Sequence, residues 1–233
     1  MNIQFFGSSV NSKIVKNTLV ENGYTLVNKD PDLIIVADYG QIIPQKTLDS
    51  TKNGNLNLHP SLLPQYRGPT PVPSAILAKE TQTGITIIEM IQEVDAGPIV
   101  AQQTIAIKPQ DNSKTLLTRC FTLGSKLLIK ILPDYIEHKI TPKPQPTNSS
   151  TPLTKKFTKQ AGFVSWQNFI KHSKNQFVDI DHKIRAFYPW PGIHTKMPNN
   201  RVLKLLPNQM LQLEGKQPIS WQAFISGYQH LLK

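Results

Sequence analysis

The sequence predicts an α/β protein, with an abbreviated doubly wound domain followed by a small α+β module. Three observations predict this class. Apolar strand-like runs alternate with helical patterns over the first 140 residues, which indicates an α/β domain. Residues 33–37, Leu-Ile-Ile-Val-Ala, form a continuous apolar run typical of a parallel strand covered on both faces. A proline-rich segment then separates this region from a more basic C-terminal part.

The chain begins with a strand-like run at residues 2–6 that leads into a tight turn. Ser8 or Ser9 can cap a helix that runs to about Asn22. Only nine residues, 24–32, precede the next strand, too few for another strand with its crossover helix. If the sheet is doubly wound, it is therefore an abbreviated one.

Two more strands and a long helix complete the first domain. Residues 55–59 form a strand that Pro60 ends, and residues 83–90 form another. A helix starts near 111–113 and carries a regular apolar stripe, and we expect Pro133 to limit it.

Residues 141–154 contain four prolines among Ser, Thr and Asn residues, which is typical of an extended linker. We therefore divide the chain into a first domain at 1–140, a Pro-rich linker at 141–157 and a basic module at 158–233.

The module has about 75 residues, near the lower limit for independent folding. We expect a short helix within 180–187, a turn at 198–200 between two strands, and a final helix capped by Ser220.

The charge is uneven along the chain. The net formal charge is +11, of which residues 1–130 carry +2 (12 basic, 10 acidic) and residues 131–233 carry +9 (14 basic, 5 acidic). Such asymmetry favours a polyanionic partner, with nucleic acid ahead of a membrane surface. The alternative is a basic protein from a lysine-rich proteome.

Cysteine usage and hydropathy indicate the compartment. A single cysteine, Cys120, excludes an intrachain disulfide and a cysteine metal cage, which fits a reducing environment. The longest apolar runs are too short to span a bilayer, and the first residues do not resemble a signal peptide. We expect a cytoplasmic protein with no membrane attachment. The histidines show no metal-ligand spacing, and we expect no metal.

The strand at 55–59 carries the first candidate site residues. Asn57 and His59 are two residues apart, so their side chains project from the same face near the carboxyl end of the strand. Ligands bind at that edge of open α/β sheets. An amide beside an imidazole can stabilise the oxyanion of a carbonyl under attack. Alone, this pattern is more often a polar strand end.

Asp95 lies in a tight turn at residues 93–98 and is the third candidate. A carboxylate near an imidazole fixes its tautomer and can stabilise its charged form. Whether Asp95 meets His59 depends on the fold.

Several segments resemble the folate-dependent formyltransferases. Residues 57–68 (NLHPSLLPQYRG) and 95–99 (DAGPI) resemble the signature of that family. Residues 183–192 (KIRAFYPWPG) and 212–221 (QLEGKQPISW) look like its members that act on methionyl-tRNA, and residues 37–44 (ADYGQIIP) are similar to their folate-pocket loop. With gaps, the resemblance covers nearly the whole chain.

This resemblance implies a shortened form of such an enzyme, with a Rossmann-like formyltransferase domain and a truncated, barrel-like C-terminal module. Its donor substrate would be 10-formyltetrahydrofolate, and its acceptor would be the methionine amino group of initiator methionyl-tRNA. Asn57 and His59 would stabilise the tetrahedral oxyanion. Asp95 would hold His59 and relay the proton that the amine loses.

The resemblance also assigns binding residues. The folate would contact Tyr39, Gly40, Ile42, Ser61, Leu62, Leu63, Pro64 and Val94. We expect tRNA contacts from Arg67, Lys155, Lys156, Lys159 and Arg185, although the three lysines could also be solvated charge. We expect a monomer.

The chain also departs from the family pattern. Asp38 replaces a small apolar residue and places a carboxylate near the pterin pocket, or else points to solvent. The stretch before Leu33 that would carry a basic loop for the acceptor stem is nearly absent. Two other functions stay open: a formyltransferase for an amino sugar nucleotide, and a non-catalytic RNA-binding derivative.

Overall fold

The computed structural model describes residues 1–146 and 148–232. Thr147 of the predicted linker and Lys233 of the predicted module lie outside the described residues. The chain forms two compact units. The first contains Met1–Val72, Thr81–Ile107 and Leu116–Lys155, and the second contains Pro73–Glu80, Lys108–Thr115 and the chain from Lys156 onward. The domain boundaries expected from the sequence stay a prediction.

The first unit is built on a six-stranded sheet with the strand order β2-β1-β3-β4-β5-β6. β1, β2, β3 and β4 are parallel, whereas β5 is antiparallel to β4 and to β6. The strands are β1 (Asn2–Phe6), β2 (Thr25–Leu26), β3 (Leu33–Ala37), β4 (Asn55–His59), β5 (Gln82–Glu89) and β6 (Ile99–Ala106). This parallel-rich α/β sheet confirms the predicted fold class of the first domain.

The helices that begin before residue 140 are α1 (Val10–Glu21), α2 (Gln45–Leu48), α3 (Pro71–Leu77) and α4 (Ser113–Ile136). Ser9 caps α1, and its side chain accepts a hydrogen bond from the Ser12 N–H at 3.0 Å. The expectation that Pro133 limits the long helix was wrong, because α4 continues to Ile136. A proline in the last turn removes only one intrahelical hydrogen bond, so the helix can continue.

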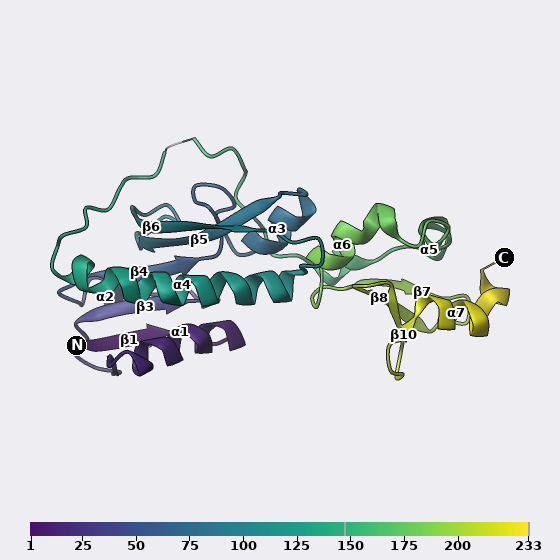
Figure 1. Ribbon diagram of the computed structural model, residues 1–233, viewed down its shortest axis with the longest axis horizontal. Coiled ribbons are helices and arrows are strands. Elements are labelled where there is room, and N and C mark those ends of the chain that lie inside the picture. The colour runs from purple at the N-terminus through teal and green to yellow at the C-terminus, as the bar shows by residue number, and fades with distance from the viewer. Residues whose placement is uncertain (147, 233) are drawn as a thin grey trace. The chain divides into compact units, whose positions relative to one another are not determined.

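The core of the first unit lies between this sheet and its helices (Figure 1). Every residue of β3 is buried, as the continuous apolar run predicted. Gly124 lets α4 approach the sheet closely, because a Cβ there would lie 2.7 Å from Cγ1 of Ile85 and 3.3 Å from Cδ2 of Leu58. α4 therefore packs against the strand that carries Asn57 and His59.

Two strands of this sheet were not expected from the sequence. Residues 25–26 form β2, a strand of two residues, although no helix occurs between it and β3. β6 is a full strand at the opposite edge. None of its residues is buried, and its sequence shows no regular apolar alternation.

The second unit contains a four-stranded antiparallel sheet with the order β10-β9-β8-β7. Its strands are β7 (Ile193–Lys196), β8 (Val202–Leu206), β9 (Met210–Leu213) and β10 (Ile219–Ser220). Its helices after residue 155 are η1 (Lys159–Gly162), α5 (Trp166–Ser173), η2 (Val178–Ile180), α6 (Asp181–Ala186), α7 (Trp221–Tyr228) and η3 (Gln229–Leu231). Within the described strands, β7 and β10 are the two edges of an open sheet. This small antiparallel sheet confirms the fold class predicted for the C-terminal module.

An aromatic cluster forms the core of the second unit. Phe169 lies at its centre, with ring centroids 5.2 Å from Phe177 and 6.3 Å from both Trp221 and Phe224. Ser220 caps α7, as predicted, and this helix carries two of these rings, Trp221 and Phe224, both buried. The second unit thus has an apolar core of its own.

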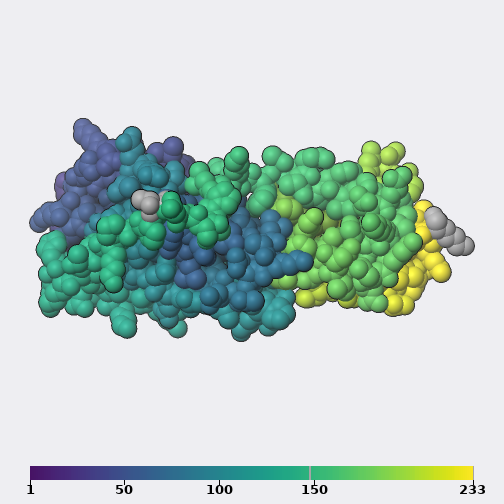
Figure 2. Space-filling model, turned by 90° about the horizontal axis from the view of Figure 1, so that it is seen from above, coloured from purple at the N-terminus to yellow at the C-terminus, as the bar shows by residue number. Residues whose placement is uncertain are grey.

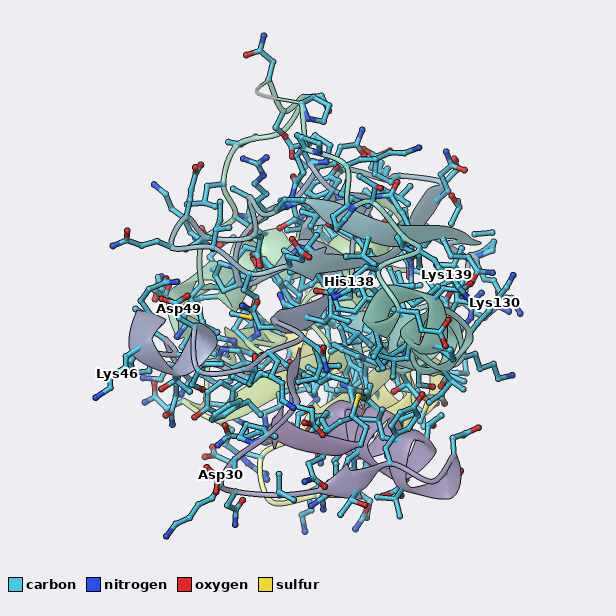
Figure 3. The ribbon with its side chains drawn as sticks, turned by 90° about the vertical axis from the view of Figure 1, so that its left-hand side faces the viewer. Asp30, Lys46, Asp49, Lys130, His138 and Lys139 are labelled. Carbon is cyan, nitrogen blue, oxygen red and sulfur yellow. The ribbon has the colours of Figure 1, made fainter. Side chains whose placement is uncertain are left out.

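The surface of the first unit carries charges of both signs. Figure 3 shows exposed side chains around one end of this unit, namely Asp30, Lys46, Asp49, Lys130, His138 and Lys139. Lys139 pairs with Glu137 at 2.5 Å. Among residues 1–146 and 148–232, no helix combines the length and the apolar character needed to cross a membrane.

Candidate active site

Asn57 and His59 lie on β4, next to β3 on one side and β5 on the other. They are alternate residues of one strand, so their side chains leave the same face of the sheet. Asn57 is half-buried, whereas His59 is only 5% exposed. The central position of β4 in the sheet therefore fixes the backbone from which both side chains project.

Asp95 meets both of these residues. Its Oδ1 lies 3.4 Å from Nδ2 of Asn57, and its Oδ2 lies 3.5 Å from Nδ1 of His59. The Gly68 N–H donates a hydrogen bond of 2.8 Å to the same Oδ2. The structure thus brings together the amide, the imidazole and the carboxylate that the sequence singled out.

The second ring nitrogen of His59 faces the protein backbone. Its Nε2 lies 3.0 Å from the carbonyl oxygen of Tyr66. A carbonyl oxygen can only accept, so Nε2 carries a proton in this arrangement, and Nδ1 faces the carboxylate of Asp95. The Tyr66 carbonyl therefore orients the imidazole.

The turn that carries Asp95 is packed tightly against the end of β5. β5 runs antiparallel to β4, with Glu89 opposite Leu56, so the chain after Glu89 must double back for Asp95 to reach Asn57. A Cβ at Gly97 would lie 1.7 Å from the carbonyl oxygen of Glu89. Only glycine permits this close approach.

A hydrogen-bond network holds the loop after β4, at residues 61–64. The Thr86 hydroxyl donates to the Ser61 carbonyl at 2.6 Å and accepts from the Leu63 N–H at 3.2 Å. Nε2 of Gln102 donates to the Leu63 carbonyl at 3.0 Å and to the Thr86 hydroxyl at 2.8 Å. Two strands, β5 and β6, thus position the loop to which the resemblance assigns folate binding.

Replacing Thr86 with valine is expected to destabilise the first unit. The change keeps the shape of the side chain but leaves buried partners of the hydroxyl unpaired, which costs about 1–3 kcal/mol. Urea unfolding should show a lower midpoint for Thr86→Val than for Thr104→Val, a control on the exposed edge strand β6. Equal midpoints would mean that this network does not stabilise the loop.

The other residues expected to contact the folate lie on two loops. Tyr39 and Met90 pack against one buried apolar cluster, so the loop after β3 and the loop after β5 rest on the same core residues. Gly40 is exposed, and Ile42 and Val94 are 97% and 56% exposed.

The Asp38 carboxylate lies close to the beginning of α1. Asp38 adopts a φ of 48°, and its Oδ2 accepts a hydrogen bond of 3.5 Å from Nδ2 of Asn11 in the first turn of α1. A carboxylate near a helix N-terminus is electrostatically favourable.

Two arginines expected to contact tRNA are engaged within their own units. Nε and Nη2 of Arg67 donate to Oε1 of Gln145 at 3.1 and 2.8 Å, and its Nη1 lies 3.8 Å from Glu93. Nε of Arg185 donates to Asp181 at 2.6 Å, and its Nη1 donates to the Asp111 carbonyl at 2.9 Å. Their assignment to tRNA stays a prediction.

The three lysines are exposed. Lys155 is in the first unit, whereas Lys156 and Lys159 are in the second. Their assignment to tRNA also stays a prediction.

Sequence reasoning missed the contribution of residues 143–146 and 148–155, which belong to the first unit (Figure 2). Lys143 forms a β-bridge with Ile99, and Gln145 bonds Arg67 and the Asp95 turn. Thr154 donates its N–H to the Arg67 carbonyl at 2.8 Å. A proline-rich segment shows no periodic pattern, so nothing in its composition indicated these contacts.

A pocket of about 330 Å³ lies beside the Asp95 turn. It is lined by Arg67, Glu93, Val94, Ser149, Thr151 and Leu153. The described residues contain no group of three or more His, Cys, Asp or Glu side chains that could hold a metal ion.

Comparison with known sequences identifies the class of this protein. The formyl transferase family model matches residues 11–132, a stretch that includes Asn57, His59 and Asp95. The chain belongs to the formyl transferase family.

A methionyl-tRNA formyltransferase from Chloroflexus aurantiacus is 40% identical over 178 residues, which are 76% of this chain and 54% of that protein. One from Enterococcus faecalis is 38% identical over 170 residues, 73% of this chain and 52% of that protein. The chain thus spans about half the length of the curated relatives it matches.

Solved structures share the fold. HypX from Aquifex aeolicus in complex with tetrahydrofolic acid matches 88% of this chain and 37% of its own, with a TM-score of 0.69 and 21% identity. A sugar N-formyltransferase from Shewanella sp FDAARGOS_354 matches 88% of this chain and 96% of its own, with a TM-score of 0.67 and 19% identity. A methionyl-tRNA formyltransferase from Clostridium thermocellum matches 94% of this chain and 99% of its own, with a TM-score of 0.65 and 19% identity.

Proposed function

We propose that this protein transfers the formyl group of 10-formyltetrahydrofolate to the amino group of methionine on initiator methionyl-tRNA. The observation that carries the proposal is the Asp95 carboxylate, which lies within 3.5 Å of polar atoms of Asn57, His59 and Gly68. The relatives that are about 40% identical and carry the name methionyl-tRNA formyltransferase support the choice of acceptor.

The reaction needs three kinds of help from the protein. The amine nitrogen forms a bond to the formyl carbon, and the bond from that carbon to the folate nitrogen N10 breaks. The amine loses one proton, and N10 gains one, so the reaction is balanced without an oxidant or a further reactant. The protein must stabilise the oxyanion of the intermediate, accept the proton from the amine and hold the two substrates together.

The candidate residues suit these tasks. Nδ2 of Asn57 carries two N–H groups, and its 3.4 Å contact with Asp95 uses at most one, so the other can donate to the oxyanion. His59 would add a second donor when its ring turns from the Tyr66 carbonyl. The Asp95 carboxylate would accept the proton of the amine, directly or through water.

Three segments of the first unit could hold the folate. The loop after β3 exposes the apolar side chain of Ile42, and the loop after β5 exposes that of Val94. Both loops pack on one buried apolar cluster. The third segment is the loop at residues 61–64, held by Thr86 and Gln102. Exposed apolar side chains beside a fixed backbone suit a flat heterocycle, whose faces need apolar contacts and whose edge needs hydrogen bonds.

The test is an assay with 10-formyltetrahydrofolate and two acceptors, initiator methionyl-tRNA and an amino sugar nucleotide. We expect formyl transfer to methionyl-tRNA only. Transfer to the sugar nucleotide alone would replace the proposed acceptor. Tight tRNA binding without transfer to either acceptor would favour the non-catalytic RNA-binding function.

Methionyl-tRNA binding is expected to weaken when Lys155, Lys156 and Lys159 are replaced together by glutamine. Each neutralised phosphate releases counterions, and a duplex-like site gives a slope of about −0.9 per contact in a plot of log affinity against log salt. The triple variant should flatten this slope by up to about three contacts' worth. Lys46, Lys130 and Lys139, exposed on the first unit, provide the matched control (Figure 3). An unchanged slope in the first triple variant would remove these lysines from the tRNA site.

A further inference from the structure

The side chain of Gln145 joins the two segments that surround the Asp95 carboxylate. Its Nε2 donates to the carbonyl oxygens of Asp95 and Gly97, both at 2.8 Å. Its Oε1 accepts from Nε and Nη2 of Arg67 at 3.1 and 2.8 Å. Both hydrogens of the amide and both lone pairs of its oxygen are thereby used.

Asp95 is held both through its backbone and through its side chain. The backbone of Asp95, at a φ of 51°, is bound through its carbonyl to Gln145. Its side chain accepts from the N–H of Gly68, the residue that follows Arg67. A shift of the turn relative to Arg67 would therefore change the distance from the carboxylate to Gly68, and with it the distance to His59.

We propose that Gln145 is a positioning residue that sets the place of the Asp95 carboxylate for catalysis. Gln145 contacts the backbone of the Asp95 turn and the Arg67 guanidinium, so it acts through Asp95. The proposal assigns this role to a segment that the composition indicated only as a linker, and it rests on the proposed function because part of its test is formyl transfer.

Other contacts hold the same segment in place without Gln145. Thr151 accepts from the Tyr66 N–H at 2.6 Å, and Ser149 donates to the Pro64 carbonyl at 2.8 Å. Thr154 donates its N–H to the Arg67 carbonyl and accepts from the Thr70 N–H. A change at position 145 should therefore leave the segment bound and the protein folded.

Two variants separate the hydrogen bonds that Gln145 donates to the Asp95 turn from those that it accepts from Arg67. Gln145→Leu removes all four hydrogen bonds. Gln145→Glu keeps the acceptors for Arg67 but cannot donate to the two carbonyls, and it adds a negative charge beside the turn. We expect kcat to fall about tenfold or more in both, with little change in KM for the folate, because a small displacement of a catalytic group slows chemistry more than binding. Gln103→Leu, at an exposed position on β6, should behave like the wild type.

The decisive measurement repeats Gln145→Leu in the Asp95→Asn background. If Gln145 acts through the Asp95 carboxylate, the loss of kcat should nearly vanish there, because the carboxylate is already absent. The same fold loss in both backgrounds, an unchanged kcat in the single variant, or a loss confined to KM would overturn the proposal.

A second measurement does not depend on the substrates. The backbone amide proton of Gly68 reports its hydrogen bond to Asp95, and its NMR signal should move in Gln145→Leu and in Asp95→Asn but not in Gln103→Leu. An unmoved Gly68 signal in a folded Gln145→Leu variant would overturn the positioning role. If the wild type transfers no formyl group while the Gly68 signal moves as expected, the proposed function fails and the positioning of Asp95 stands.

Discussion

Replacing Asn57 or His59 with alanine is expected to lower kcat for formyl transfer by about 10²-fold or more. Removing one donor to a developing oxyanion costs roughly 2.7–4 kcal/mol in the transition state. The two side chains leave the same face of β4 and share the Asp95 carboxylate as a neighbour. Their losses should therefore add incompletely in the double variant, because residues that act as one unit are not independent.

The measurement is single-turnover formyl transfer to methionyl-tRNA, with circular dichroism to show that each variant is folded. His138→Ala provides a matched control, since this histidine is exposed on the surface of the same unit (Figure 3). Turnover near that of the wild type in either Asn57→Ala or His59→Ala would remove that residue from the catalytic set.

The second large effect is expected from Gly97→Ala. A Cβ at this position would lie 1.7 Å from the Glu89 carbonyl oxygen, far inside contact distance, so the turn must move away from the end of β5. Asp95 is two residues before Gly97 and moves with it. A displacement of about 1 Å in a catalytic group can cost about 10²-fold in rate, so we expect kcat to fall by about this factor.

Gly227→Ala is the control for this substitution, because a Cβ at Gly227 meets nothing within 4 Å. Crystal structures of both variants would show whether the turn has moved. A Gly97→Ala variant with normal turnover would mean that the position of Asp95 is not critical for the reaction.

The sequence predicted the central strands and the first helix well, because each carries a local signal. The apolar run at 33–37 became the fully buried β3, and Ser9 capped α1 as its position indicated. Asn57 and His59 could be placed on one face from their spacing alone, since that inference needs only the geometry of a strand.

Contacts between distant segments could not be predicted in the same way. Asp95 reaches Asn57 only because its turn folds back over β5, and this depends on the backbone contact at Gly97 rather than on any periodic pattern. β6 was missed because an edge strand with little buried surface has no regular apolar alternation. Gln145 was missed because its partners are 48 to 78 residues away in the chain.

The late position of Gln145 has a consequence for how the protein is made. Chains are synthesised from the N-terminus, and domains begin to fold as they emerge. Asp95 precedes Gln145 by 50 residues. The side chains of Asn57, His59 and Asp95 are therefore synthesised well before Gln145. At about 5–20 residues per second, this interval lasts several seconds. The emerging polypeptide therefore passes through a stage in which the three candidate catalytic residues are present but the Asp95 turn lacks its hydrogen bonds to Gln145. Maturation of the site is completed by residues that follow the long helix α4, and ribosome-bound chains halted before and after Gln145 would bracket that step.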